Sequence, residues 1–157
     1  MSKQYVQLAN HKPYAAFPRG VRRVIVEPKV DGYRLMAVMK GGKVTFMSRF
    51  GTPHPYTENL AFIGEQLKKL GMRNGMMIDG EIVKGSWRGT GKIRKQNLSD
   101  ADKADIRKNA KLWVFDILTE SNSKEKQIDR SKRLRKLIGR GSANVMAAPQ
   151  YLSLIHI

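Results

Sequence analysis

Short apolar runs with alternating polar positions recur along the first three quarters of the chain. Val21 to Val26 is rich in β-branched residues, which favour a strand. Tyr33 to Met39 alternates, and the Gly41-Gly42 pair that follows is typical of a two-residue hairpin turn. The pattern therefore predicts strands at Val21–Val26, Tyr33–Met39, Val44–Ser48, Met76–Val83 and Leu112–Leu118.

Between these strands, apolar residues at helical spacing predict helices. Leu60, Ile63, Leu67 and Leu70 form one apolar stripe, with Thr57 as the expected N-cap and Gly71 just past the end. Ser99 with Asp102 predicts a capping box for a polar helix to about Asn109. A last helix is expected to end at Gly139, with Asn122 and Glu125 as the residues that cap its beginning. Hairpins mixed with helices, without βαβ alternation, predict an α+β domain on an antiparallel sheet.

The end of the chain fits this pattern poorly. After Pro149 we expect no helix or strand that closes a domain. The last six residues, Leu152–Ile157, are what a common transposon-adapter sequence from DNA library preparation would encode in frame. We therefore interpret residues 1–150 as a partial domain and residues 151–157 as a non-native or truncated tail. The alternative is an ordinary apolar C-terminal strand.

Length and composition narrow the class of protein. A chain of 157 residues with 41% apolar residues can form one domain with a core. It contains no cysteine, which excludes disulfides and thiolate metal sites. No apolar run approaches the roughly 20 residues needed to cross a bilayer, and the N-terminus lacks a signal-peptide core. We expect a soluble, cytoplasmic protein, monomeric and not bound to a membrane.

The charge indicates the partner. Thirty Lys and Arg against thirteen Asp and Glu give a net charge of +17. Such an excess attracts a polyanion, and neutralising nucleic-acid phosphates releases counterions. Binding to anionic lipid, or solubility alone, is the alternative, but no lipid-facing amphipathic helix is evident.

The chemistry is concentrated around Lys29. Lys29, Asp31, Gly32 and Arg34 have K-x-D-G-x-R spacing between two predicted strands. A lysine can attack an activated phosphorus only as the neutral amine, and nearby arginines and partial burial would lower its pKa. Asp31-Gly32 would form a tight turn that aims the lysine, and the planar fork of Arg34 could contact a nucleotide. An ordinary Asp-Gly hairpin beside a solvated lysine is the alternative.

Three later segments follow Lys29 in a fixed order: Ser48-Arg49-Phe50-Gly51, Asp79-Gly80-Glu81, and Leu112-Trp113-Val114-Phe115-Asp116-Ile117-Leu118. With them the chain resembles the covalent nucleotidyltransferase superfamily of DNA ligases, RNA ligases and mRNA capping enzymes. The resemblance implies a nucleotidyltransferase (ATP-grasp-like) adenylation domain. Each segment alone also has a plainer interpretation: a strand end at Ser48, a turn at Asp79-Gly80 and a core residue at Phe115.

The resemblance assigns a role to each motif. Lys29 matches the lysine that becomes linked to AMP or GMP, and Glu27 matches the position that reads the adenine amino group. Glu81 matches the position that holds the ribose or its metal, and Phe115 the aromatic that stacks on the base. The remaining nucleotide-binding positions implied are Pro28, Val30, Arg34, Ser48, Arg49 and Phe50. Pro28 departs from the usual pattern because proline removes a backbone donor.

Within this superfamily, the chain most resembles the compact ATP-dependent DNA ligases of T7-like bacteriophages, over about Val21 to Leu118. It implies ATP and Mg²⁺ as cofactors, nicked duplex DNA as partner, and a role in DNA replication, repair or recombination. The family's later acidic strand, its K-x-K pair and its OB-fold domain are missing, so we expect this chain not to complete ligation by itself. An RNA ligase, a capping guanylyltransferase, or a non-catalytic basic nucleic-acid-binding module is the alternative.

Weaker features complete the picture. Lys92, Arg94 and Lys95, beside Trp87, form a basic segment that could contact DNA phosphates or simply be solvated. The basic residues of the last helix, Lys132 to Arg140, are interpreted as a solvated face. Gly85 to Lys92 fails the phosphate-loop pattern, and the three histidines are too scattered to predict a metal site.

Overall fold

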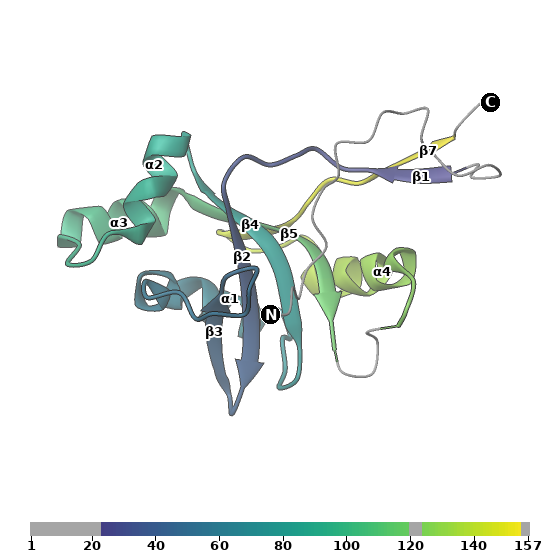
Figure 1. Cartoon of the computed structure of the whole chain (residues 1–157), viewed down its shortest axis with the longest axis horizontal. Coiled ribbons are helices and arrows are strands. Elements are labelled where there is room, and N and C mark those ends of the chain that lie inside the picture. Colours follow the sequence, from purple (N-terminus) through teal and green to yellow (C-terminus); the bar gives the residue numbers. More distant parts are fainter. Residues whose placement is uncertain (1–22, 120–123, 155–157) are drawn as a thin grey trace.

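The computed structural model describes residues 23–119 and 124–154. They form a five-stranded sheet of order β3-β2-β4-β5-β6 and a separate two-stranded ribbon of β1 and β7 (Figure 1). The strands are β1 (Arg23–Val26), β2 (Tyr33–Lys40), β3 (Lys43–Met47), β4 (Met77–Lys84), β5 (Ala110–Leu118), β6 (Val145–Ala147) and β7 (Tyr151–Leu154). The helices are η2 (Thr57–Leu60), α1 (Ala61–Lys69), α2 (Trp87–Gly91), η3 (Lys92–Arg94), α3 (Asp100–Asn109) and α4 (Gln127–Ile138).

The sheet is antiparallel except at one edge. Strands β2, β3, β4 and β5 pair antiparallel with their neighbours, whereas β6 pairs parallel with β5. The predicted α+β class on an antiparallel sheet is confirmed. The parallel edge was not predicted, because a strand of three residues is too short to show a period of two.

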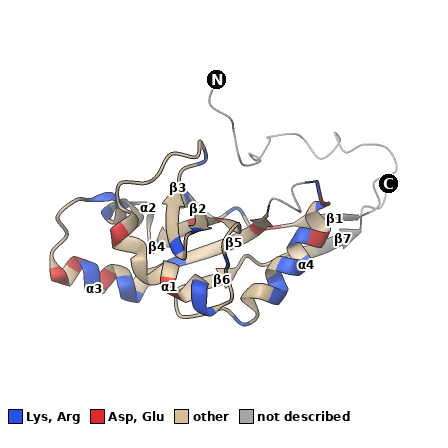
Figure 2. Ribbon diagram, turned by 90° about the horizontal axis from the view of Figure 1, so that it is seen from below, with Lys and Arg blue, Asp and Glu red and all other residues tan. Residues whose placement is uncertain are grey.

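One face of the sheet carries the main core. In Figure 2, α1, α3 and α4 lie below the strands, so they cover the same side of the sheet. Residues with no exposure from strands and helices form one cluster there, because alternate strand residues point to the same face. Examples are Leu35, Ile78, Ile82, Phe46, Leu60, Ile63 and Leu67. The alternate residues of these strands, which include Arg34, Asp79 and Glu81, point to the opposite face.

The turn and helix-end predictions have mixed outcomes. Gly41 and Gly42 have φ of 56° and 74°, which confirms the predicted hairpin turn. Ser99 caps α3 as predicted, with its hydroxyl accepting from the Asp102 N–H at 3.1 Å. Gly71, with φ of 104°, and Gly139, with φ of 54°, lie at the predicted helix ends.

The N-cap predictions for the other two helices are wrong. Thr57 begins the short helix η2 with Tyr56 as the N-cap residue, and its hydroxyl donates to the His54 carbonyl at 2.7 Å. A hydroxyl that donates to a carbonyl outside the helix does not cap a helix N–H. Helix α4 begins at Gln127, later than predicted, and Asn122 lies outside the described residues.

A strand does follow Pro149, contrary to the expectation from sequence. β7 pairs antiparallel with β1, from Arg23 opposite Leu154 to Val26 opposite Tyr151. The partner strand lies more than 120 residues away in sequence, so no local pattern could indicate the pairing. The origin of residues 151–157 stays a prediction, and residues 155–157 lie outside the described residues.

None of the helices in the described residues is long and apolar enough to span a bilayer.

Candidate active site

The segment between β1 and β2, residues 27–32, is held against β4 at its end. The Gly32 N–H donates to Glu81 Oε1 at 3.2 Å. A Cβ at Gly32 would meet the Ile82 carbonyl oxygen and would lie 2.6 Å from Val83 Cγ1. Gly32 is therefore needed for close approach to β4 rather than for a positive φ. Lys29, three residues earlier, is exposed.

The register of β2 and β4 brings the predicted site residues together. Arg34 lies opposite Glu81, and Met36 lies opposite Asp79. The Arg34 guanidinium donates to both oxygens of Asp79, at 2.7 and 2.5 Å, in a bidentate ion pair. Asp79-Gly80 is consequently not a turn, which corrects that alternative: both residues lie inside β4. The two acidic positions of this motif flank one arginine.

Phe115 joins this group because β5 is irregular at that point. Asp79 pairs with Asp116 and Gly80 pairs with Val114, so Phe115 has no partner in β4. Such a bulge re-aims a side chain out of the normal alternation. The Arg34 guanidinium lies 4.7 Å from the centre of the Phe115 ring. Phe115 is only partly buried and is absent from the core cluster, so the core interpretation of this residue is wrong.

Burial sets the electrostatics of the two carboxylates. It raises the pKa of Asp79 above its ordinary value, although hydrogen bonding from Arg34 and the charge of Arg34 act in the opposite direction. Burial also raises the pKa of Glu81, against the Gly32 N–H and the charges of Arg34 and Lys29. The charge of Lys29 therefore acts on the Glu81 carboxylate.

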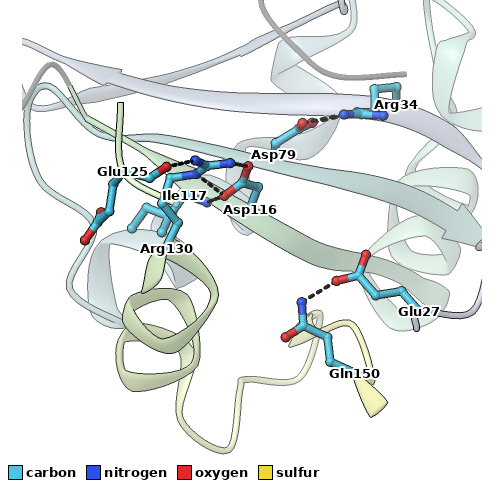
Figure 3. A network of polar contacts seen from close by, with 8 residues as sticks. All are labelled: Glu27, Arg34, Asp79, Asp116, Ile117, Glu125, Arg130 and Gln150. Atoms are coloured by element: carbon cyan, nitrogen blue, oxygen red, sulfur yellow. Dashed lines mark hydrogen bonds and ion pairs between the residues drawn. The ribbon is translucent and has the colours of Figure 1, made fainter. Parts of the chain in front are cut away.

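An ion pair that the sequence did not indicate fixes the end of β5. Arg130 of α4 donates to both oxygens of Asp116, at 2.9 Å each, and to the Glu125 carbonyl at 2.5 Å (Figure 3). The hydrogen bond from Arg130 to Asp116 raises the pKa of Arg130. Arg130 and Asp116 are fourteen residues apart in sequence, and only the packing of α4 beside β5 joins them. No sequence signal distinguishes Arg130 from the other basic residues of this helix.

A second contact missed from sequence involves Glu27. The Gln150 side-chain amide donates from Nε2 to Glu27 Oε1 (Figure 3). Gln150 lies in the segment between β6 and β7, 123 residues further along the chain. Glu27 is partly buried, whereas Pro28 and Lys29 are exposed.

The second predicted motif lies in a turn directly after β3. β3 ends with Met47 opposite Met36, so this turn lies near the beginning of β2, where Arg34 is located. The Ser48 hydroxyl accepts from the Phe50 N–H at 3.2 Å and bonds the Thr52 hydroxyl at 2.8 Å. Arg49 is exposed, and its guanidinium lies 4.7 Å from the Phe50 ring centre. Ser48 thus shapes the turn that presents Arg49.

The basic segment after α2 is held in place by one buried side chain and by hydrogen bonds to its backbone. Ile93 is fully buried, and Asn59 donates to the carbonyls of Ile93 and Lys95 at 2.9 and 3.1 Å. Lys92, Arg94 and Lys95 are all exposed, and the Arg94 guanidinium lies 5.2 Å from the Tyr33 ring centre. Lys92–Arg94 form the helical turn η3 rather than an open loop, and Lys95 follows it directly.

The described residues contain no group of three or more His, Asp or Glu side chains that could hold a metal ion. Glu81, the predicted metal contact, accepts a hydrogen bond from the Gly32 N–H with one of its two oxygens. One carboxylate fits a Mg²⁺ ion that keeps most of its other contacts to phosphates and water. It does not fit a metal held by protein alone.

Comparison with known proteins identifies the family of this chain. The family described as "ATP dependent DNA ligase domain" matches residues 7–153. The chain belongs to this family. The α+β fold of a nucleotidyltransferase ligase adenylation domain, predicted from the motifs, is thereby confirmed. A comparison with curated proteins finds no match.

Solved structures of ligases share the fold of this ligase domain. They include the ATP-dependent DNA ligase of bacteriophage T7 in complex with ATP, at TM-score 0.60 and 15% identity, over 84% of this chain and 49% of that one. Pmar-Lig_PreS3 matches at TM-score 0.64 and 21% identity, over 83% and 31%. An archaeal ATP-dependent RNA ligase matches at TM-score 0.52 and 17% identity, over 85% and 32%. The chain spans about a third to a half of the length of these relatives.

Proposed function

We propose that this ligase domain carries the adenylylation site of an ATP-dependent DNA ligase, with Lys29 as the nucleophile. The observation that carries the proposal is the junction of residues 27–32 with the sheet. Gly32 is bonded to Glu81, and Glu81 lies opposite Arg34, which in turn lies over Phe115. Residues from the first, third and fourth motifs thus meet at one place beside an exposed lysine.

In the proposed first step, the neutral amine of Lys29 attacks the α-phosphorus of ATP. A nitrogen–phosphorus bond forms, the bond to the bridging oxygen breaks, and pyrophosphate leaves with that electron pair. Lys29 must first lose a proton to solvent. Glu27 would read the adenine amino group, Phe115 would offer its ring to the base, and Glu81 would contact the ribose or the metal.

The positive side chains of the site have a complementary role. Arg34 is held by Asp79 and Phe115, and Arg49 is exposed on the turn after β3. In sequence, Pro28 and Val30 flank Lys29, and Ser48 and Phe50 flank Arg49. Cations placed beforehand stabilise charge that develops on the transferring phosphoryl group. Mg²⁺, when bound with ATP, would neutralise the triphosphate, with Glu81 as its one protein contact.

The later steps involve nucleic acid. The adenylyl group would pass to the 5′-phosphate of a nick, and the neighbouring 3′-hydroxyl would then displace AMP. We favour nicked duplex DNA because the matching family is described by DNA ligase activity. The fold is also shared with an archaeal RNA ligase, so RNA is the alternative substrate. Lys92, Arg94 and Lys95 are the proposed phosphate contacts, because all three are exposed cations in η3 or directly after it.

Mass spectrometry of the full-length protein after incubation with ATP and Mg²⁺ tests the proposal. We expect an adduct of one AMP that is lost in Lys29→Ala and retained in Lys40→Ala, which changes another exposed lysine. Sealing of nicked DNA but not of nicked RNA would support nicked duplex DNA as the substrate. Binding of duplex DNA without any adduct would instead favour a non-catalytic basic module.

A further inference from the structure

The side-chain amide of Gln150 has a single orientation in this structure. Its oxygen Oε1 accepts from the Ser131 hydroxyl and from Arg135 Nε, the latter at 3.1 Å. Ser131 and Arg135 are four residues apart in α4, so they lie on the same side of the helix. With two donors on the oxygen, the NH₂ group must point away from α4. It points to Glu27 (Figure 3).

The helix that supports Gln150 is itself well fixed. Ser131 is 3% exposed, and Arg130, beside it, is locked to Asp116 of β5. Arg135 also reaches the carbonyl of Ala148, two residues before Gln150, at 3.4 Å. The position of Gln150 relative to the sheet is therefore set by both its own backbone and α4.

Glu27, by contrast, lies just after β1, in a stretch without regular secondary structure. Among the described residues, the amide of Gln150 is the hydrogen-bond partner that orients the Glu27 carboxylate. A carboxylate has two oxygens with about four acceptor sites, and Gln150 uses one of them. The remaining sites accept hydrogen bonds and donate none.

We propose that Gln150 is a positioning residue that holds the Glu27 carboxylate for recognition of the purine, and so contributes to selecting ATP over GTP. This inference rests on the proposed function, in which Glu27 reads the base. Adenine presents an amino donor at C6, whereas guanine presents a carbonyl acceptor there. A carboxylate held in place attracts the first and repels the second, and a carboxylate free to turn away discriminates less.

The test is the rate of adduct formation by the full-length protein, measured against nucleotide concentration. In Gln150→Met, which keeps the side-chain length but removes the amide, we expect the KM for ATP to rise about tenfold, as for loss of one charge-assisted hydrogen bond. The maximal rate should stay within about twofold, because Lys29 is untouched. The preference for ATP over GTP should fall by a similar factor.

Purine riboside triphosphate, which lacks the C6 amino group, separates positioning from a general structural effect. Its KM should change less than about twofold between wild type and Gln150→Met. The reason is that this nucleotide cannot make the contact between the C6 amino group and Glu27 in either protein. Ser131→Ala should raise the KM for ATP in the same direction but less. Gln127→Met, at an exposed position of the same helix, should leave all values unchanged.

An equal rise in KM for ATP and purine riboside triphosphate would overturn the proposal, since Gln150 would then support the site without regard to the base. Unchanged ATP kinetics in Gln150→Met would overturn it too. If the wild-type chain forms no adduct with any nucleotide, the proposed function itself fails, and this inference fails with it.

Discussion

At the scale of single residues, His54 shows how burial changes chemistry beside the site. Its ring stacks on Tyr56 with centroids 4.6 Å apart, and its Nε2 is buried without a hydrogen-bond partner in the part of the chain that the structure describes. Burial lowers the pKa of His54, and the charge of Arg94 adds to this, against a hydrogen bond to the backbone of Arg34. His54 is therefore more stable neutral in the fold than in the unfolded chain.

This predicts a stability change with pH. Because the pKa of His54 is lower in the folded state, the unfolded state binds a proton more readily below about pH 6.5. The contribution is fully present above the unfolded pKa and is lost as pH falls through the folded value. In His54→Phe, which keeps a ring against Tyr56, the free energy of unfolding should fall less between pH 7 and 5 than in wild type.

Urea denaturation at several pH values measures this difference. Tyr56→Phe is the matched control, since it leaves His54 in place and should keep the wild-type slope. Parallel pH curves for wild type and His54→Phe would contradict the prediction.

At the scale of elements, the approach of residues 27–32 to β4 decides the geometry of the site. Gly32 fits because it has no Cβ, and Gly80 fits for the same reason, since a Cβ there would lie 2.5 Å from the Trp113 carbonyl oxygen. Two glycines thus let a loop and a bulged strand pack closely on β4. The hydrogen bond from Gly32 to Glu81 depends on this closeness.

Gly32→Ala should therefore damage the site more than the fold. We expect a loss of stability of about 1–3 kcal/mol, as for other overpacked sites. The rate of AMP adduct formation should fall by at least about tenfold, because the loop must move away from Glu81 and carry Lys29 with it. Thermal denaturation and mass spectrometry measure the two effects.

Gly91→Ala is the control for this change. A Cβ at Gly91 would lie 3.8 Å from the Tyr33 hydroxyl, an ordinary contact, and Gly91 has no positive φ. This variant should keep both stability and adduct formation. Equal losses in Gly32→Ala and Gly91→Ala would show that the close approach of Gly32 has no special role.

At the scale of the whole molecule, a net charge of +17 is distributed over distinct surfaces. In Figure 2, Lys and Arg follow the exposed side of α4, and they also occur on α3. On α4, Lys132 lies 3.5 Å from Asp129 and Arg133 lies 2.7 Å from Glu125, so part of this charge is already paired. Lys92 and Arg94, in contrast, lie on η3, where the Arg94 guanidinium is 5.2 Å from the ring centre of Tyr33 at the start of β2.

The two surfaces should therefore differ in nucleic-acid binding. Replacing Lys92, Arg94 and Lys95 by alanine should weaken binding to duplex DNA and reduce the slope of log K against log salt by about 2–3, near 0.9 for each lost phosphate contact. Replacing Lys132 and Lys136 of α4 together with Arg140 just after it removes the same charge and should change the slope by less than about 0.5. Fluorescence anisotropy over a salt series measures both. Equal changes would show that only net charge matters.

Much of the fold was predictable because local forces decide it. Alternation identified β2, β3 and β4, glycine pairs identified the hairpin, and Ser99 identified the start of α3. The predictions failed where a distant partner decides the outcome. The Thr57 hydroxyl donates to the His54 carbonyl outside its helix, and β7 pairs with the distant strand β1.

For the site, the spacing around Lys29 identified Lys29 and Arg34 as candidates, and the resemblance to the nucleotidyltransferase superfamily added Glu81 and Phe115. How these four side chains meet depends on the packing of the strands and helices. The bulge that turns Phe115 toward Arg34, the ion pair of Arg130 with Asp116, and the contact of Gln150 with Glu27 each join residues that are far apart in the chain. Side-chain contacts of this kind depend on strand register and helix packing, which no local pattern of residues records.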